Sequence, residues 1–423
     1  MSTAPLFSTV RIKIDPPIKD FSMTKNPVDE FYEVLRQQDD TAEDRGDFVD
    51  LLKRVKDEFH LSQRQLSQAL SVNRRTVQRI LSREAQKIDL DTFQKIQQFL
   101  DVSPEELLNM YNANLEPSEL RELERAKKAG YISRNFDLGK LKKEGFVSTD
   151  RDFDTIEERI KQFFELSSIY EYEVAGQEIP MFSRTRRSYS NKMLKFWVVS
   201  AIRQIRLIGN SNPFDREMLK QVIPRLRQLT RDEEKGLLRA ARALYSAGVT
   251  LVVQGYLTGT QIRGATFVVD GQPALVLTDY KKKYDTVWFA LLHELYHVLK
   301  DLGRIEKLGY HITGEEQDLF VSQMSEKEAD EFASQFLLSD EKFDYIRRFI
   351  DIPEVVRDHA KEWNVHPSII YGRYAFENNE YGKYAKHRPS VSKAVEALRV
   401  HPWDQESIET ASESLKEIYA ELN

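Results

Sequence analysis

The sequence predicts an α+β protein that is mostly α-helical and holds more than one domain. Apolar residues recur at helical spacing along most of the chain, beginning at Phe48. Short β-branched runs between residues 249 and 277 predict a small sheet (Val249–Val253, Ala265–Val269 and Ala274–Leu277). At 423 residues the chain exceeds what one ordinary hydrophobic core supports.

The composition narrows the class of protein. The chain has no cysteine, so it forms no disulfide, and any metal site must use histidine and carboxylate ligands. No apolar stretch approaches the roughly 20 residues that span a bilayer, and the N-terminus lacks the pattern of a signal peptide. We therefore expect a cytoplasmic protein with no membrane partner. The net charge of −6 argues against nucleic-acid binding by the whole chain but leaves room for one basic module.

Five segments are expected from these patterns. Residues 1–45 form an arm, and residues 46–110 form a compact all-α domain. A helical linker region follows over 111–200, and the sheet-containing domain covers 201–380. Residues 381–423 form a helical extension at the C-terminus.

The first compact domain has the helix pattern of a DNA-binding module. Ser62–Gln65 fits a capping box that starts one helix, and a break at Ser71–Asn73 separates it from a second helix over Arg74–Leu81. The second helix would expose Arg74, Arg75 and Gln78 at its leading end, where a recognition helix meets base edges. Gln63 suits a phosphate contact, and Arg79 adds positive charge at the DNA backbone.

This stretch, Leu61 to Leu81, resembles the Cro/lambda-repressor type of helix-turn-helix, although Ser71 stands where such motifs often have glycine. The resemblance implies a double-stranded DNA operator as partner and a homodimer that matches two half-sites. The competing interpretation is a helical domain that makes protein contacts alone, because acidic residues are also frequent here.

The second domain carries a metal-binding pattern on a helix. His293 and His297 are four residues apart, so they share a helical face and can offer two imidazoles to one ion. Glu294 lies one step round the helix, where it can reach a metal-activated water as general base. The apolar flanks from Trp288 to Leu292 and at Val298–Leu299 predict a buried helix.

A catalytic zinc also needs a third protein ligand. The helix that begins near Ser325 offers Glu326, which lies on the side of its apolar face, with Glu328 as the competing ligand. Asp330 could hold the outer nitrogen of a liganding histidine. His311 falls in a loop between the two helices, from which it can reach the site, but an exposed position is the stronger expectation.

These residues resemble the ImmA/IrrE family of zinc metallopeptidases. The match rests on Asp285–His297 and Glu326–Ala333, and it extends over about residues 215–376. Tyr296 and Ser339 depart from the family, which often has glycine and proline there. The resemblance implies a zincin-like fold in which His293, His297 and Glu326 bind Zn2+ and Glu294 is the catalytic base.

Together the two domains look like a HigA-like regulator, and three functions follow. In the first, a DNA-binding transcriptional regulator carries a zinc-dependent endopeptidase that cleaves a regulatory protein, or itself, to control a phage- or toxin–antitoxin-type operon. In the second, an antitoxin or repressor binds a toxin encoded nearby, and the peptidase domain is a non-catalytic scaffold. A third, weaker expectation is a peptidase whose N-terminal domain only recruits substrate.

Overall fold

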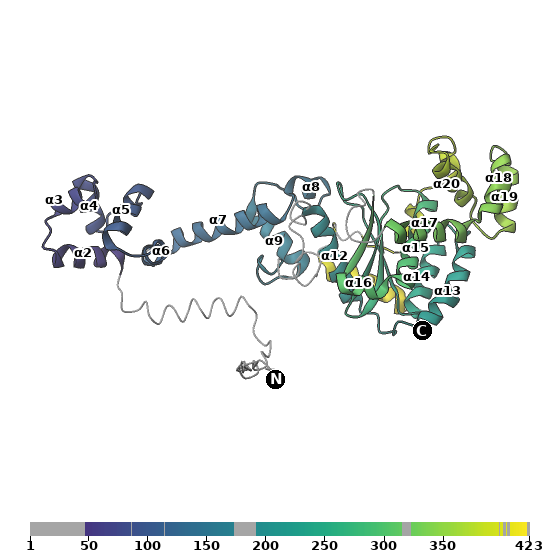
Figure 1. The fold of residues 1–423 in the computed structure, drawn as a ribbon, viewed down its shortest axis with the longest axis horizontal. Helices are drawn as coiled ribbons and strands as arrows, with labels where there is room; N and C mark the ends of the chain where they lie inside the picture. The colour runs from purple at the N-terminus through teal and green to yellow at the C-terminus, as the bar shows by residue number, and fades with distance from the viewer. Residues whose placement is uncertain are drawn as a thin grey trace, which may run out of the picture. The chain divides into compact units, whose positions relative to one another are not determined.

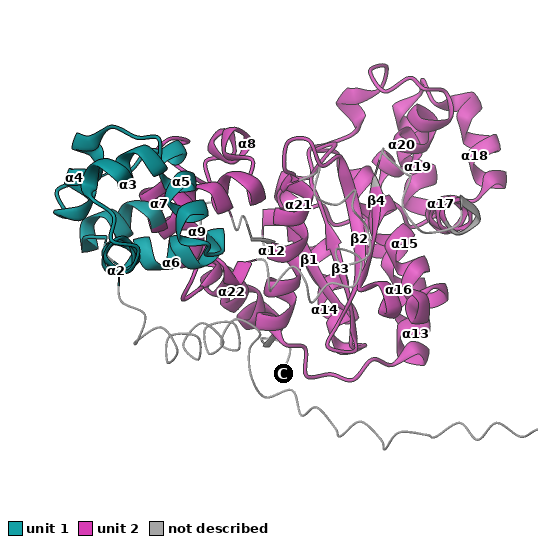
Figure 2. Ribbon diagram, turned by 60° about the vertical axis from the view of Figure 1, so that its left-hand side comes forward, with its two compact units in different colours: residues 1–123 teal, residues 124–423 magenta. Residues whose placement is uncertain are grey.

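The computed structural model describes residues 47–85, 87–113, 115–172, 192–314, 323–396, 398–400, 403 and 407–420. The expected arm, residues 1–45, lies outside these ranges. The chain divides into two compact units, Met1–Leu123 and Glu124–Asn423, which Figure 2 colours separately. The fold is α+β and mostly helical, as predicted.

Unit 1 is all-α in the part of it that is described. Its helices are α2 (Phe48–Glu58), α3 (Gln63–Ala69), α4 (Arg74–Leu81), α5 (Leu90–Leu100), α6 (Pro104–Asn112) and the first residues of α7 (Pro117–Asn135). The predicted capping box is present, because Ser62 accepts from the Gln65 amide while the Gln65 side chain accepts from the Ser62 amide. Side chains at helical spacing from α2 to α6 form the core, among them Leu52, Leu66 and Ile96.

Unit 2 combines helices with a five-stranded sheet (Figure 1). The strands are β1 (Thr250–Gln254), β2 (Ile262–Val269), β3 (Gln272–Leu277), β4 (Tyr310–Gly314) and β5 (Arg399–Val400), in the order β4-β2-β3-β1-β5. The helices are α8 (Leu138–Lys143), α9 (Phe153–Phe164), α12 (Lys192–Ile208), α13 (Arg216–Leu229), α14 (Gly236–Ser246), α15 (Tyr284–Lys300), α16 (Leu302–Leu308), α17 (Gln323–Leu337), α18 (Asp340–Ile346), α19 (Pro353–Glu362), α20 (Pro367–Glu377), α21 (Ser392–Glu396) and α22 (Ile408–Ala420).

The sheet is mixed. Strand β1 pairs in parallel with β3 and β5, whereas β2 pairs antiparallel with β3 and β4. The β2–β3 hairpin turns at Asp270–Gly271, where both residues have positive φ (51° and 77°). Glycine and aspartate tolerate this conformation, which explains why this dipeptide marks the turn in the sequence.

Helices cover both faces of the sheet. On β2, Thr266 hydrogen-bonds Glu294 of α15, while the next residue, Phe267, packs against Trp197 of α12 with ring centroids 6.3 Å apart. Consecutive strand residues point to opposite faces. Therefore α15 and α12 lie on opposite sides of the sheet, which makes unit 2 a three-layer arrangement.

One hydrophobic cluster runs through unit 2 from Tyr131 to Tyr419. It includes residues of the expected linker region, such as Phe163 and Phe196, and of the expected C-terminal extension, such as Trp403. The segments predicted over 111–200 and 381–423 thus contribute to the core that holds the candidate site. Residues 173–191 of that linker lie outside the described ranges.

A turn separates α13 from α14, and in it the Asp232 carboxylate accepts from the amides of Glu234 and Lys235. One local prediction differs from the structure. The segment expected as a loop around His311 is strand β4 at the edge of the sheet. Its pairing with β2 decides this, and such a long-range contact leaves little trace in a five-residue stretch.

Candidate metal centre and helix-turn-helix surface

Helix α15 places the candidate ligands inside unit 2. Its sequence holds four leucines, which favour helix, and its apolar side chains are buried on nearly every side. His293 is 2% exposed, and Glu294 and His297 are 0% exposed. Three polar side chains within such a helix require partners, because unpaired buried polar groups are costly.

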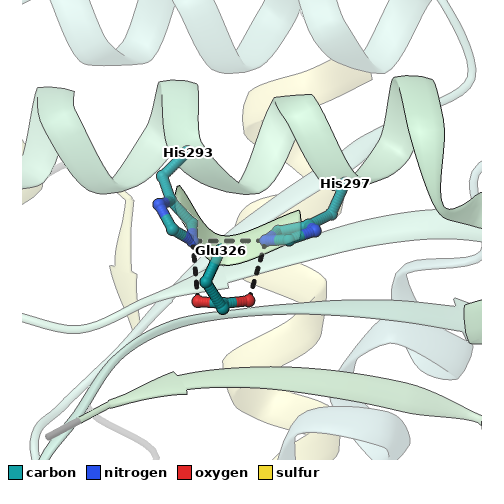
Figure 3. Close-up of side chains that lie close together, drawn as sticks. All are labelled: His293, His297 and Glu326. Carbon is teal, nitrogen blue, oxygen red and sulfur yellow. Dashed lines mark hydrogen bonds and ion pairs between the residues drawn. The ribbon is translucent and has the colours of Figure 1, made fainter. Parts of the chain in front are cut away.

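The structure brings His293, His297 and Glu326 together. Figure 3 shows the two rings projecting from α15 toward the Glu326 carboxylate of α17. The two Nε2 atoms are 3.2 Å apart. Nε2 of His293 lies 3.4 Å from one Glu326 oxygen, and Nε2 of His297 lies 3.3 Å from the other.

The Nδ1 atom of each histidine ring lies within hydrogen-bond distance of a carboxylate. Nδ1 of His293 lies 2.8 Å from Asp330 Oδ1, the contact predicted from sequence, and Nδ1 of His297 lies 2.8 Å from Asp301 Oδ2. A neutral ring that donates its Nδ1 proton to a carboxylate keeps the Nε2 lone pair free. In that neutral form both Nε2 lone pairs would point at one place, and the Asp330 and Asp301 contacts match the second-shell arrangement of metal-binding histidines.

The charges of the cluster are strongly coupled. Burial lowers the pKa of His293, but hydrogen bonds to Asp330 and Glu326 outweigh it and raise that pKa to about 10. Burial raises the pKa of Glu326, but its contacts with His293, His297 and His311 hold that pKa far below the usual range. The cluster of His293, His297 and Glu326 therefore favours a positive charge beside the Glu326 carboxylate.

This donor set fits a zinc ion. Ligand atoms about 2.0–2.1 Å from a tetrahedral zinc ion lie about 3.3–3.4 Å from each other. The distance of 3.2 Å between the two Nε2 atoms agrees with this spacing, and Glu326 places one oxygen beside each nitrogen, 3.4 Å from that of His293 and 3.3 Å from that of His297. Two imidazoles and one carboxylate are also a ligand set that catalytic zinc uses, with a further position left open.

Glu294 points at strand β2. Its Oε2 accepts a hydrogen bond from Thr266 Oγ1 at 2.6 Å, whereas Oε1 is buried without a hydrogen-bond partner among the described residues. Gly264 makes room for it, since a Cβ atom there would come within 2.8 Å of Oε1. An oriented, half-satisfied carboxylate beside two metal-type histidines is suited to take up a proton.

His311 is a member of the cluster that the sequence prediction misplaced. It lies on β4, is buried, and its Nε2 is 2.7 Å from Glu326 Oε1. Its ring centroid is 4.4 Å from that of His297. Asp301 was also missed, although its position four residues after His297 on the same helical side could have indicated it.

Glu328, the competing ligand, does not reach the histidines. It is exposed and accepts a hydrogen bond from the Tyr296 hydroxyl. Tyr296, one of the two departures from the peptidase family, also packs against Phe332 with ring centroids 5.8 Å apart. The departure therefore links α15 to α17 without occupying the ligand cluster.

In unit 1, α4 has the exposed polar face expected of a recognition helix. Asn73 caps the helix by accepting from the Arg75 amide. Arg74, Arg75, Gln78 and Arg79 are exposed, while Val77, Ile80 and Leu81 are buried. Gln63 is half-buried at the start of α3. Ser71 adopts φ 50° in the turn, which explains why glycine is frequent there.

Comparison with known proteins identifies this part of the chain. Residues 52–107 match the family model described as Helix-turn-helix, so the chain contains a DNA-binding domain of the kind that transcriptional regulators use. No curated protein and no solved structure matches the chain. The resemblance of unit 2 to the ImmA/IrrE family therefore stays a prediction. Among the described helices, none is both long and apolar enough to cross a membrane.

Proposed function

We propose that this DNA-binding regulator is also a zinc-dependent endopeptidase, with His293, His297 and Glu326 as ligands and Glu294 as general base. The single observation that carries the proposal is the convergence of two Nε2 atoms and one carboxylate at 3.2–3.4 Å, while both Nδ1 atoms are bound by carboxylates. A buried carboxylate between two imidazoles requires a proton on a ring or a bound cation to compensate its charge, and zinc is the cation that we propose.

The chemistry divides between the ion and the chain. When bound, zinc supplies Lewis-acid chemistry that activates water and polarises a peptide carbonyl. Thr266 fixes Glu294 through its Oε2, which leaves Oε1 to accept the proton of the attacking water and later deliver it to the leaving amine. Asp330 and Asp301 keep the two rings in the orientation and tautomer that bind metal.

Metal content tests the first half of this proposal. The full-length protein, purified without chelator, is expected to hold one zinc per chain by elemental analysis. His293→Ala is expected to lose it, because one of three ligands is gone. Absence of stoichiometric zinc from the wild type would remove the enzyme proposal.

Cleavage tests the second half. The zinc-loaded protein is incubated with the product of its neighbouring gene, and the mixture is analysed by mass spectrometry, with cuts within the chain itself scored as well. Glu294→Gln keeps the ligands and removes the base, so we expect a cut that this variant loses while its zinc content stays unchanged. A cut that survives in Glu294→Gln would exclude Glu294 as the base.

A second candidate function is a repressor of antitoxin type that binds a toxin encoded nearby, with unit 2 as a non-catalytic scaffold. The complete burial of Glu294 and His297 favours it, because buried residues meet substrate only after a rearrangement. Stable binding of the neighbouring protein without cleavage, unchanged in Glu294→Gln, would support this candidate.

The DNA partner we propose is an operator at the chain's own promoter, bound by a homodimer. The exposed side chains of α4 support direct reading of bases in the major groove. Gel shift with the promoter fragment and light scattering of the complex test the site and the stoichiometry.

A further inference from the structure

A pocket of about 510 Å³ opens one turn before the candidate metal centre. Its walls come from the first half of α15, the second half of α17, and α20. This volume falls in the range typical of ligand-binding pockets, about 300–1,000 Å³. Neither the metal ligands nor Glu294 line it, so the chemistry proposed above leaves the pocket without a role.

The pocket wall is mainly apolar. Leu337, Leu338 and Ile369 are buried within it, and Phe376 stands at its rim with 58% of its surface exposed. Charged residues also line it, five of them basic (Arg263, Lys281, Lys283, Arg373 and Arg388) and two acidic (Asp285 and Glu377). Arg388 donates to both oxygens of Asp285 in a buried ion pair. Arg373 pairs with Glu377 and Asp340.

Phe289 joins the pocket to the metal centre. It lines the pocket and lies one helical turn before His293, with ring centroids 6.3 Å apart. On α17, Ser334 lines the pocket four residues after Asp330, which holds His293. The pocket and the metal ligands therefore follow one another along the same two packed helices.

Strand β2 makes a second connection. Between Ile262 and Gly264 the pairing with β4 shifts by one residue, so Arg263 is the extra residue of a β-bulge. A bulge redirects a side chain, and Arg263 lines the pocket while its neighbour Gly264 lies against Glu294. The general base and the pocket wall are thus adjacent on one strand.

We propose that this pocket is a specificity pocket, which takes a large apolar side chain (Leu, Met or Phe) of a protein substrate near the cleaved bond. The inference rests on the proposed peptidase function, because Phe289 of the pocket wall packs against His293, a proposed zinc ligand. The apolar wall selects the side chain through burial of its surface, and the excess of basic residues at the wall disfavours a basic one.

The test fills the pocket without touching the metal centre. In Ser334→Trp a large ring occupies the pocket, and the matched control Glu331→Trp puts the same ring on the exposed side of α17. The zinc-loaded full-length proteins receive acetylated pentapeptides that differ at one central residue. The wild type and the control are expected to prefer Leu, Met and Phe over Ala, and Ser334→Trp is expected to lose about tenfold or more of that preference.

A binding measurement separates this inference from the proposed function. N-phenyl-1-naphthylamine, an apolar fluorescent probe, is titrated into each variant in a Glu294→Gln background, where no turnover is needed. We expect the dissociation constant of the probe to be about tenfold or more higher for Ser334→Trp than for the control. Phe376→Ala, which removes an exposed rim residue at little risk to folding, is expected to weaken binding severalfold.

The outcomes are distinct. The specificity pocket is refuted, while the peptidase proposal stands, if Ser334→Trp cleaves with the same residue preferences as the control. It is also refuted if the probe binds Ser334→Trp, Phe376→Ala and the control equally. No cleavage of any peptide or protein by the wild type overturns the peptidase and the substrate role together. Weaker probe binding in both Ser334→Trp and Phe376→Ala, with the expected cleavage preference, supports the proposal.

Discussion

Gly264 and Glu294 lie in direct contact, because a Cβ atom at position 264 would come within 2.8 Å of Glu294 Oε1 and 2.9 Å of its Cγ. Glycine in a strand interior is costly and often marks the close approach of another group. Here that group is the proposed general base. The absence of a side chain on β2 thus sets the position of a catalytic carboxylate on α15.

We predict that Gly264→Ala displaces Glu294 and impairs catalysis more than metal binding. The added methyl group would break the contact between Glu294 and Thr266, and overpacking costs about 1–3 kcal/mol of unfolding free energy. Cleavage is expected to fall about 100-fold, at the lower end of a general base's contribution, with zinc content unchanged. The control is Gly303→Ala, where the new Cβ meets nothing within 4 Å. Equal activity in the two variants would contradict the role of this contact.

Asp330 should tune zinc affinity without binding the ion. Asp330→Asn weakens the hold on the His293 ring, and loss of such partners typically lowers metal affinity about 10–100-fold. Competition against a fluorescent chelator measures this, and Glu331→Gln, a neutralised acid on the exposed face of the same helix, is the control. The same loss in both variants would mean that overall charge, rather than the ring contact, governs affinity.

The sequence predicts those parts of the site whose geometry is local. His293 and His297 share a face because helical spacing requires it, and Glu326 follows from the apolar face of its own helix. His311 escapes such reasoning. Its strand forms only by pairing with β2, where Thr266 is its register partner. The short run next to Gly309 lacks the length and alternation that predict a strand. The position of His311 beside Glu326 therefore follows only from the fold.

The structure of α4 predicts how single arginines affect DNA binding. Arg75→Ala removes an exposed side chain at the leading end of the helix, and a lost base contact costs about 1–3 kcal/mol. Fluorescence anisotropy with operator DNA and with scrambled DNA should show a loss of specificity. Arg54→Ala, an exposed arginine on α2, controls for net charge. An equal loss on both DNA sequences would assign Arg75 to the phosphate backbone instead.

His366 should make unit 2 less stable at mildly acidic pH. Burial lowers its pKa from 6.5, although nearby Glu233 opposes this, and its neutral Nδ1 accepts the Ser368 amide at the start of α20. Since the unfolded chain binds the proton first, this stability is kept above pH 6.5 and lost as the pH falls below it. His366→Asn keeps a capping acceptor that does not titrate.

Thermal unfolding at several pH values measures this effect. The wild type is expected to lose stability between about pH 7 and pH 5.5, and His366→Asn to lose less. His359→Asn, which leaves the cap intact, is the control. Identical pH dependence in the wild type and His366→Asn would exclude this histidine as the cause.

The choice between the two glutamates of α17 gives the sharpest test of the metal centre. Glu326 places its oxygens 3.3 and 3.4 Å from the two Nε2 atoms, whereas Glu328 is exposed and bound to Tyr296. Glu326→Gln keeps the shape of the side chain but removes its charge, so we expect zinc affinity to fall by more than the about 10–100-fold expected for Asp330→Asn. Glu328→Gln should keep wild-type affinity, because it changes only the hydroxyl contact. Competition against a chelator measures both affinities. Zinc loss in Glu328→Gln, with zinc retained in Glu326→Gln, would contradict the assignment, because α17 would have to rotate by about half a helical turn to bring Glu328 to the histidines.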